Sequence, residues 1–204
     1  MIEVTYIDHM GSDLSVVNAA RVSFGKTHKA MTGGDTKLIK YLAKHRHMSP
    51  FGHAFASFHV KAPIFVARQL VKHKFLRWNE ISRRYVDDEP EFYVPDVWRG
   101  RSADKKQGSD GVVQTFVQDW DTYNPSLKLY TELLEDGVAP EQARMVLPQS
   151  TMTEWYWSGS LDAFIDMCNL RCKEDTQLET RLVADYIRSE MIKLFPVSVG
   201  ALVK

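Results

Sequence analysis

The chain has 204 residues, with 26 basic and 26 acidic side chains and a formal net charge of zero. Its hydrophobic content of 44% and charged content of 25% are typical of a globular protein that buries a substantial core. The balanced charge argues against a dedicated nucleic-acid binder. The sequence has no run of about 18 apolar residues, so no membrane span is predicted. The N-terminus lacks the basic start and apolar stretch of a signal peptide. We therefore expect one cytoplasmic domain over residues 1–204.

The first half of the chain predicts two strands and two helices before residue 62. Residues 3–7 alternate and are rich in β-formers, which indicates a strand. A short helix is predicted over residues 13–22, and a glycine turn leads into a second helix that ends near residue 45. Residues 54–61 alternate most clearly between apolar and polar side chains, so they predict the second strand.

The next stretch, residues 62–85, carries the densest set of candidate functional side chains. Pro63 suits a first helical position, and the apolar spacing predicts a helix to about residue 74, followed by a polar, aromatic loop. Between Arg68 and Arg84 there are six Lys or Arg residues and one acid, Glu80. This imbalance, in a chain of zero net charge, favours a local anion site, although an ordinary solvated face remains the alternative.

The second half is predicted to contain a long excursion and then mostly helix. Residues 86–111 are rich in glycine, proline and charge, and we expect a mobile loop with a possible short strand at residues 91–94. A helix is predicted over residues 115–134 with a break near Pro125, and a short helix over residues 140–146. The remaining predicted elements are a strand at residues 151–158 and helices at 161–172 and 176–195. The last helix is expected to bury Leu178, Leu182, Tyr186, Met191 and Leu194.

The sequence contains two groups of possible metal ligands, but neither group predicts a metal site. His45, His47 and His53 lie within nine residues, but their spacing fits no common metal motif. Cys168 and Cys172 lie four residues apart in a helical pattern without a histidine nearby in sequence. We expect the two cysteines to be reduced and partly buried.

Three separated stretches resemble flavin-dependent thymidylate synthases. The segment KHKFLRWNEISRRY resembles the family signature, which runs Arg-His-Arg, two residues, Ser, one residue, Asn-Glu, one residue, Ser, one residue, Arg. The matching positions are His73, Asn79, Glu80, Ser82 and Arg84, whereas Lys72 and Lys74 replace the two arginines and Arg77 replaces the first serine. The lysines keep the positive charge but lose the planar fork of a guanidinium.

The run that leads into this signature and the two later stretches also occur in the order that the family has them. The turn HMSPF resembles the family's lead-in to the flavin, which is matched by His47 and Ser49. The segment ARMVLP resembles a substrate-binding segment and places its arginine at Arg144, and the segment CNLRC places the family's activating arginine at Arg171. Departures occur at three positions, where the family usually has Asn, Arg and His and this chain has Ser160, Asp162 and Asp175.

The resemblance implies an enzyme that methylates dUMP to dTMP with FAD as cofactor and with methylenetetrahydrofolate and NADPH as co-substrates. It implies that Arg171 is the catalytic residue that activates the pyrimidine. The implied dUMP contacts are Gln69, Lys72, Glu80, Ser82, Arg84, Arg144 and Arg171. The implied FAD contacts are His47, Ser49, Lys72, His73, Lys74, Asn79, Glu80, Ser160 and Asp166.

The resemblance also implies an α+β fold with a mixed sheet flanked by helices, like that of thymidylate synthase complementing proteins, and a homotetramer with sites shared between chains. Two alternatives stay open at this point. One is a flavin-dependent enzyme that modifies another pyrimidine nucleotide, for example a hydroxymethylase. The other is a non-enzymatic nucleic-acid-binding module that uses the basic, aromatic stretch from Arg68 to Arg84.

Overall fold

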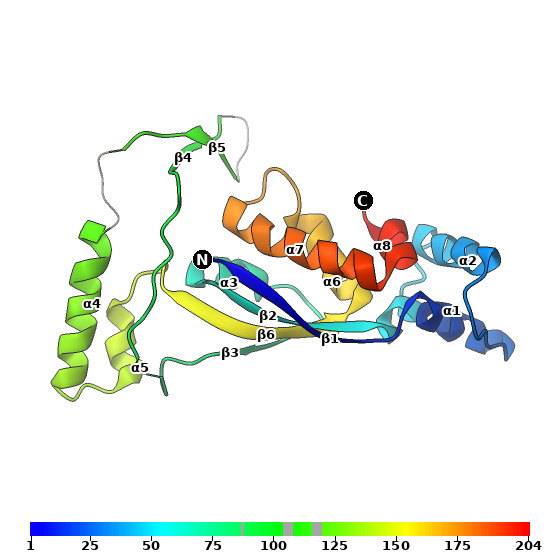
Figure 1. Ribbon diagram of the computed structural model, residues 1–204, viewed down its shortest axis with the longest axis horizontal. Helices are drawn as coiled ribbons and strands as arrows, with labels where there is room; N and C mark the ends of the chain where they lie inside the picture. The colour runs from blue at the N-terminus through cyan, green and yellow to red at the C-terminus, as the bar shows by residue number, and fades with distance from the viewer. Residues whose placement is uncertain (87, 104–107, 116–119) are drawn as a thin grey trace.

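The computed structural model describes residues 1–86, 88–103, 108–115 and 120–204. A four-stranded sheet forms its centre, and helices α3, α6, α7 and α8 lie on one side of this sheet (Figure 1). In chain order the elements are β1 (Glu3–Met10), α1 (Asp13–Arg21), η1 (Val22–Phe24), α2 (Gly33–Lys44), η2 (Ser49–His53), β2 (Phe55–Pro63), α3 (Ile64–Leu70), β3 (Leu76–Glu80), β4 (Arg99–Arg101), β5 (Ser109–Val112), α4 (Trp120–Glu135), α5 (Pro140–Ala143), η3 (Arg144–Val146), β6 (Met152–Ser160), α6 (Leu161–Arg171), α7 (Leu178–Leu194) and α8 (Pro196–Leu202).

The sheet has the strand order β1-β2-β6-β3, and each of its three pairings is antiparallel. The predicted α+β class is confirmed, but the prediction of a mixed sheet is wrong. β2 and β6 pair along their whole length, with Phe55 opposite Ser160 and Pro63 opposite Met152. Each strand runs directly into a helix, and these helices therefore leave the sheet at opposite ends. In the described part of the chain no crossover helix joins neighbouring strands of this sheet in the same direction, as a parallel pair would need.

Residues of the central strands alternate between a buried face and a polar face. Phe58 and Val60 of β2 and Trp155 of β6 are fully buried under the helices, whereas Tyr156 is 52% exposed on the opposite face. Trp78 of β3 stacks on Trp155, with ring centroids 4.3 Å apart and an angle of 17° between the planes. This alternation, of period two, fixes which side chains of each strand can approach the helices.

The segment after α3 differs from the prediction. The helix ends at Leu70 rather than near residue 74, and the chain turns through Phe75, whose positive φ of 64° lies in the left-handed region. Residues 76–80 then form β3, which was predicted as loop. The polar composition of these residues hid the strand, because β3 lies at an edge of the sheet and only Leu76 and Trp78 pack against the core.

Helix α7 is rotated relative to the prediction. Leu182 and Tyr186 were expected in the core but are 49% and 41% exposed, whereas Val183, Ala184 and Ile187 are fully buried. The predicted burial of Met191 is confirmed. The apolar residues of this helix surround much of its circumference, so their spacing alone allows both orientations. Packing against β1 and α6 selects the orientation.

The predicted excursion over residues 86–111 is only partly described, since residues 87 and 104–107 lie outside the described ranges. Its described part includes β4, which pairs with β5 in a two-stranded antiparallel sheet. Residues 91–94 were considered as a possible short strand, and the structure has an isolated β-bridge there, between Phe92 and Thr151. The mobility of this segment stays a prediction.

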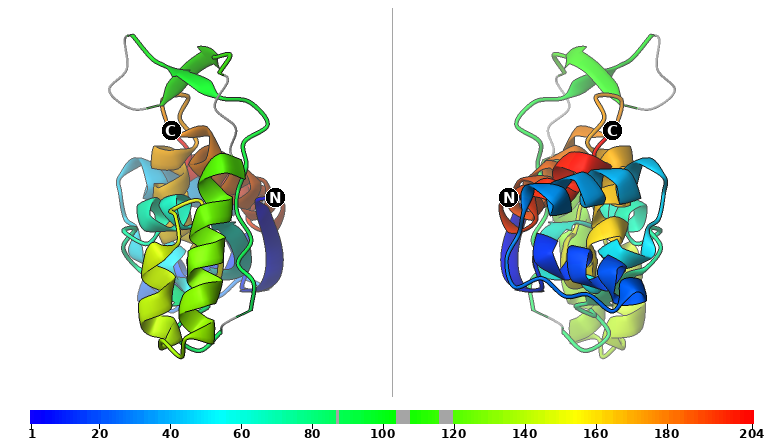
Figure 2. Two further views of the ribbon diagram at one scale, coloured as in Figure 1. Left: turned by 90° about the vertical axis from the view of Figure 1, so that its left-hand side faces the viewer. Right: turned by 90° about the vertical axis from the view of Figure 1, so that its right-hand side faces the viewer.

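At one end of the molecule α4 lies beside α5, and β4 and β5 extend outward from the excursion (Figure 2). α4 continues through Pro125, where a break had been considered possible, and residues 116–119 of the predicted helix lie outside the described ranges. Within the described ranges, no helix has the length and apolar character needed to cross a membrane.

The two ends of the chain are joined by one buried carboxylate. Asp13, at the beginning of α1, accepts hydrogen bonds from the backbone N–H groups of Val197 (2.9 Å) and Ser198 (2.8 Å) and from the Ser198 hydroxyl. These N–H groups belong to the first turn of α8, which has no intrahelical acceptors for them. The carboxylate therefore caps α8, and its negative charge interacts favourably with the positive N-terminal end of the helix dipole.

We expect Asp13→Ala to lower the free energy of unfolding by roughly 1–3 kcal/mol for each buried donor that it leaves unpaired. Asp13→Asn should give an intermediate loss, since it keeps one acceptor oxygen without the charge. Urea unfolding monitored by circular dichroism measures both changes. Asp136→Ala, at an exposed acid, serves as the control, and an equal change in Asp13→Ala and Asp136→Ala would contradict the capping role.

Candidate functional site

The C-terminal end of α6 meets the turn that follows α3, and Arg171 lies at this junction. Its Nε–H donates to Nε2 of His73 at 3.0 Å, and its Nη2 donates to the backbone carbonyl of Gln69 at 3.2 Å. The remaining terminal nitrogen, Nη1, has no partner among the described residues. The guanidinium is thus fixed in orientation while keeping donors for a ligand.

His73 is a neutral acceptor in this arrangement. Burial lowers the pKa of His73 to about 4, and the positive charge of Arg171 adds to this effect. Burial also lowers the pKa of Arg171, which stays a cation because the ordinary value of a guanidinium is so high. Because Nε2 of His73 accepts from Arg171, its proton is on Nδ1.

Gln69 is fixed by two residues at the beginning of α7, the N-cap residue Gln177 and Thr180 in the first turn. Its Nε2 donates to Oε1 of Gln177 at 2.6 Å, and its Oε1 accepts from the Thr180 hydroxyl at 3.2 Å. The side chains of Gln69, Lys72, Arg171 and Gln177 line a cavity of about 400 Å³. We call this the Arg171 cavity.

A second group of predicted residues lies around Glu80 at the end of β3. Its Oε1 accepts from the Thr153 hydroxyl at 2.6 Å and its Oε2 from Nε1 of Trp78 at 3.0 Å, so both carboxylate oxygens are held. Glu80 and Arg144 line one cavity of about 150 Å³, in which acidic side chains outnumber basic ones. Arg144 is exposed and donates to the carbonyl of Glu141.

The loop after β3 carries the other two predicted dUMP contacts. Nε of Arg84 donates to Oγ of Ser82 at 3.1 Å, and the guanidinium lies over the ring of Tyr85, 5.0 Å from its centroid. Arg84 and Tyr85 are both exposed. Arg84 is thus held by local contacts with Ser82 and Tyr85.

A third group gathers where η2 packs against α6. His47 and Ser49 are exposed there, and Ser160 is the N-cap residue of α6 but makes no side-chain capping bond. The half-buried Asp162 follows in the first turn, and its buried Oδ1 has no partner among the described residues. Asp166 is exposed on the same helix.

The structure therefore brings Gln69, Lys72, His73 and Arg171 together but keeps the other predicted residues apart from them. Helix α6 separates Ser160 from Arg171 by about 16 Å at 1.5 Å per residue. Asn79 and Glu80 are consecutive strand residues and point to opposite faces of the sheet. Lys74 and Arg77 are exposed, and the side chain of Arg77 shares the face of Asn79.

Four residues that hold this site were not identified from the sequence: Gln177 and Thr180 beside Gln69, and Trp78 and Thr153 beside Glu80. Thr180 is fully buried, so its position on the inner face of α7 was a signal only after the helix orientation was known. The spacing of Trp78 and Glu80 in one strand would have placed them on the same face if β3 had been recognised.

Comparison with known families agrees with this arrangement. The sequence model of the thymidylate synthase complementing protein family matches residues 5–197, nearly the whole chain. The chain belongs to this family. The resemblance noted in the sequence is thus confirmed, and the alternative of a non-enzymatic nucleic-acid-binding module finds no support, because the family relatives are enzymes.

Two relatives illustrate the degree of similarity. The flavin-dependent thymidylate synthase of Thermosipho melanesiensis is 40% identical over 184 residues, which cover 87% of this chain and 80% of the relative. That of Thermus thermophilus is 42% identical over 193 residues, which cover 93% and 71%.

Solved structures of the UMP/dUMP methylase PolB from Streptomyces cacaoi have the same fold. The complex with 5-Br dUMP has a TM-score of 0.88 at 34% identity and covers 98% of this chain and 94% of PolB. The complex with 5-Br UMP has a TM-score of 0.81 at 31% identity and covers 98% and 93%.

The His73–Arg171 contact predicts a pH dependence of stability. In the unfolded chain His73 has its ordinary pKa of 6.5, and in the folded chain its pKa is about 4. Between these values the unfolded state binds more protons, so stability decreases as the pH falls from 6.5 and levels off below 4. His73→Gln keeps an acceptor for Arg171 but cannot titrate. Urea unfolding at several pH values should show the decrease in the native protein relative to this variant, whereas parallel curves would contradict it.

Proposed function

We propose that this chain catalyses the reductive methylation of dUMP to dTMP, with methylenetetrahydrofolate as carbon donor, NADPH as reductant and FAD as cofactor. The observation that carries the proposal is Arg171, which is held by His73 and Gln69 and lines a cavity. The names of the relatives and the PolB complexes support the same substrate class.

Arg171 would activate the pyrimidine by electrostatic stabilisation. Methylation at C5 needs a nucleophilic carbon, and negative charge then develops on the N3/O2 side of the ring. A guanidinium that is already oriented and partly desolvated stabilises this charge without reorganising. The neutral His73 is essential to this role, because a protonated His73 would repel Arg171 instead of accepting its hydrogen bond.

Gln69 and Lys72 would bind the same nucleotide from the α3 side of the Arg171 cavity. The side-chain amide of Gln69 cannot turn freely, since Gln177 and Thr180 determine where its nitrogen and oxygen lie. Lys72 adds a positive charge at the mouth of the cavity but, unlike arginine, no planar pair of donors.

The donors at the beginning of α6 fit a phosphate-bearing flavin cofactor. Ser160 leaves the first-turn N–H groups of α6 without a side-chain cap, and His47 and Ser49 add exposed polar groups nearby. Asp162 is the one side chain of unfavourable charge there. When bound, the flavin supplies the hydride chemistry that no protein side chain can supply. His47, Ser49 and Ser160 would hold it, and we include Asn79, Lys72, Lys74, His73, Glu80 and Asp166 as proposed contacts from the resemblance.

We further propose that the active form is a homotetramer in which each site combines residues of different chains. Glu80, Ser82, Arg84 and Arg144 do not reach the Arg171 cavity of their own chain. Arg84 and Arg144 are exposed guanidiniums suited to a phosphate, yet the cavity beside Arg144 is rich in acids. These residues would therefore bind a nucleotide held by the Arg171 of a neighbouring chain.

UMP should be tested as a second substrate in the same assay, because PolB is described as a methylase of both UMP and dUMP. UMP differs from dUMP only in its 2′-hydroxyl group. Formation of 5-methyl-UMP at a rate above that of dTMP would show that the ribonucleotide is the preferred substrate.

Arg171→Ala should lower the rate of dTMP formation by roughly 10²-fold or more, the scale of losing an oxyanion donor. Arg171→Lys should restore only part of this rate, because an ammonium cannot span the N3/O2 edge with two parallel bonds. The assay uses FAD, NADPH, methylenetetrahydrofolate and dUMP, with the rate expressed per folded site. An Arg171→Ala variant that loses stability but keeps its rate would show that the arginine only caps α6.

Mixing two inactive variants tests the shared site. If each site takes Arg171 from one chain and Arg144 from another, random assembly of Arg171→Ala with Arg144→Ala chains leaves about a quarter of the sites intact in a symmetric oligomer. We expect coexpressed chains to recover activity that neither variant has alone, and light scattering to give a tetramer mass. Absence of recovery in mixed tetramers would place both arginines in the site of a single chain.

A further inference from the structure

The two cysteines of the chain lie at the C-terminal end of α6, on either side of Arg171 in sequence. Cys168 is buried in the core, and Cys172 is the partly exposed C-cap residue of the helix. Both are free thiols, as the sequence predicted. The function proposed above uses neither of them, although each is within four positions of its central arginine.

The two thiols meet across one turn of the helix. Residues four positions apart lie on the same helical face, and the backbone N–H of Cys172 donates to the carbonyl of Cys168 at 2.9 Å. The Sγ–H of Cys168 is 3.7 Å from the carbonyl oxygen of Ala184 in α7. The hydrogen bond with Cys172, together with burial, raises the pKa of the Cys168 thiol. Cys168 therefore keeps its proton, and Cys172 is the thiol that solvent reaches.

Both cysteines line a cavity of about 230 Å³, which we call the dithiol cavity. Its described lining also includes three basic side chains, from Lys173, Arg188 and Lys204, and no acid. Arg188 is paired with Asp185 at 2.9 Å. Asn169 fixes the last residues of the chain beside this cavity, since its Oδ1 accepts from the backbone N–H of Lys204 at 3.0 Å. Reactive cysteines are found in partly exposed, positively charged surroundings of this kind.

The spacing of the cysteines allows a disulfide only if the end of the helix moves. Cα atoms four residues apart in an α-helix are separated by about 6 Å, which is within the range of a disulfide. Their Cβ atoms are about 5–6 Å apart, whereas a disulfide brings them to roughly 3.5–4.5 Å. Cys168 is held in the core and Cys172 ends the helix, so the closure must come from Cys172 and from Arg171 directly before it.

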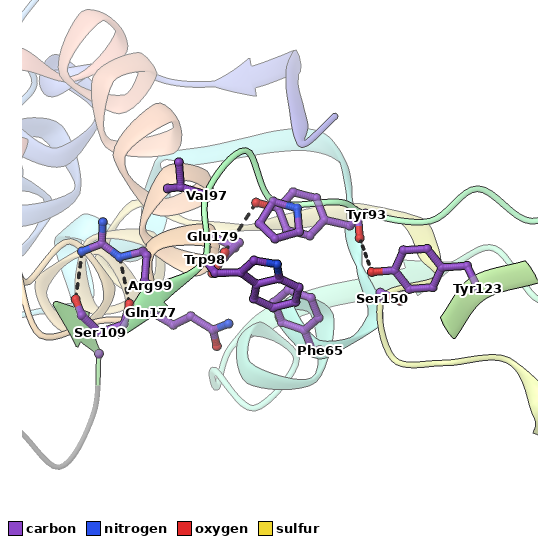
Figure 3. Close-up of a pocket in the computed structure, with 12 residues that line it drawn as sticks. Phe65, Tyr93, Val97, Trp98, Arg99, Ser109, Tyr123, Ser150, Gln177 and Glu179 are labelled. Atoms are coloured by element: carbon purple, nitrogen blue, oxygen red, sulfur yellow. Dashed lines mark hydrogen bonds between the residues drawn. The ribbon is translucent and has the colours of Figure 1, made fainter. Parts of the chain in front are cut away.

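Such a movement would reach the Arg171 cavity from two sides. Arg171 depends on its hydrogen bonds of 3.0 Å to His73 and 3.2 Å to the Gln69 carbonyl. Gln177, five positions after Cys172, holds the side chain of Gln69. Gln177 also lines a neighbouring cavity of about 450 Å³ with aromatic walls (Figure 3). A bond between the two thiols would therefore disturb both groups that orient the site.

We propose that Cys168 and Cys172 form an oxidisable dithiol site, which peroxide converts to a disulfide that reversibly inactivates the Arg171 cavity. In the first step Sγ of Cys172 attacks one oxygen of hydrogen peroxide, the O–O bond breaks, and a sulfenic acid and one water form. Sγ of Cys168 then attacks the sulfenic sulfur, the S–S bond forms, and the S–O bond breaks. The leaving hydroxide takes the thiol proton and becomes the second water.

The dithiol thus loses two electrons, and the peroxide gains them. An external thiol restores both cysteines by disulfide exchange. The expected loss of activity rests on the proposed function, whereas formation of the disulfide does not.

Treatment of the purified protein with hydrogen peroxide, followed by peptide mass mapping, tests the chemistry. The native protein should contain a bond between Cys168 and Cys172 within one chain. Cys168→Ala should stop at a sulfenic acid on Cys172, which dimedone traps. Cys172→Ser should keep its remaining thiol unmodified, because Cys168 is buried.

The consequence for the site is measured in two ways. The oxidised native protein should form dTMP at least about tenfold more slowly, because small displacements of a positioned group lower rates strongly, and dithiothreitol should restore the rate. Cys172→Ser is the matched control and should keep its rate after the same treatment. The Nε2 resonance of His73 in ¹⁵N NMR should shift on oxidation of the native protein but not of this control, because the imidazole loses the Arg171 donor.

The proposal is overturned if both thiols of the folded native protein stay free, if the bond forms between chains, or if the disulfide changes neither the rate nor the His73 resonance. An equal loss of activity in the native protein and Cys172→Ser would also contradict it. Absence of dTMP formation by the reduced native protein would instead contradict the proposed function, and the disulfide and the His73 resonance would still test this inference.

Discussion

The pairing of β2 with β6 is the constraint on which the rest of the structure depends. The two strands run antiparallel over nine residue pairs, and each continues without a loop into a helix. α3 leaves from one end of the pair and α6 from the other, and both fold back over the same face of the sheet (Figure 1). Their C-terminal ends consequently approach each other, and this approach brings Arg171 to His73 and Gln69.

Burial then determines the chemistry of that junction. A histidine and an arginine in contact would repel each other if both were charged. Desolvation avoids this repulsion, because it lowers the pKa of His73 and keeps the imidazole neutral. Its acceptor nitrogen binds Nε of the arginine, the Gln69 carbonyl binds Nη2, and the Arg171 side chain lines the cavity. The hydrogen bonds of Gln69 with Gln177 and Thr180 fix the side chain on the opposite wall of the cavity in the same way. The site is thus shaped by residues that would not themselves touch a substrate.

The alternation of β3 divides the family signature between two directions. Asn79 and Glu80 are adjacent in sequence but face opposite sides of the sheet, and Glu80 is held by Trp78 and Thr153 on the inner side. One chain cannot turn both groups toward a single Arg171 cavity. A signature that is contiguous in sequence therefore faces two sides of the sheet, which is the physical basis for proposing sites shared between chains.

The sequence by itself determined the α+β class, the order of most elements, the family and the residue types at the Arg171 junction, because short-range periodicity and motif spacing are local properties. It did not determine the direction of strand pairing, the presence of β3 or the rotation of α7, which buries Val183 and Ile187 instead of Leu182 and Tyr186. These depend on contacts between residues far apart in the chain, such as the 98 positions that separate His73 from Arg171. The neutral state of His73, the hydrogen bonds that hold Gln69 and the cavity lined by aromatic side chains also depend on tertiary contacts, because burial and cavity shape exist only after the elements have packed.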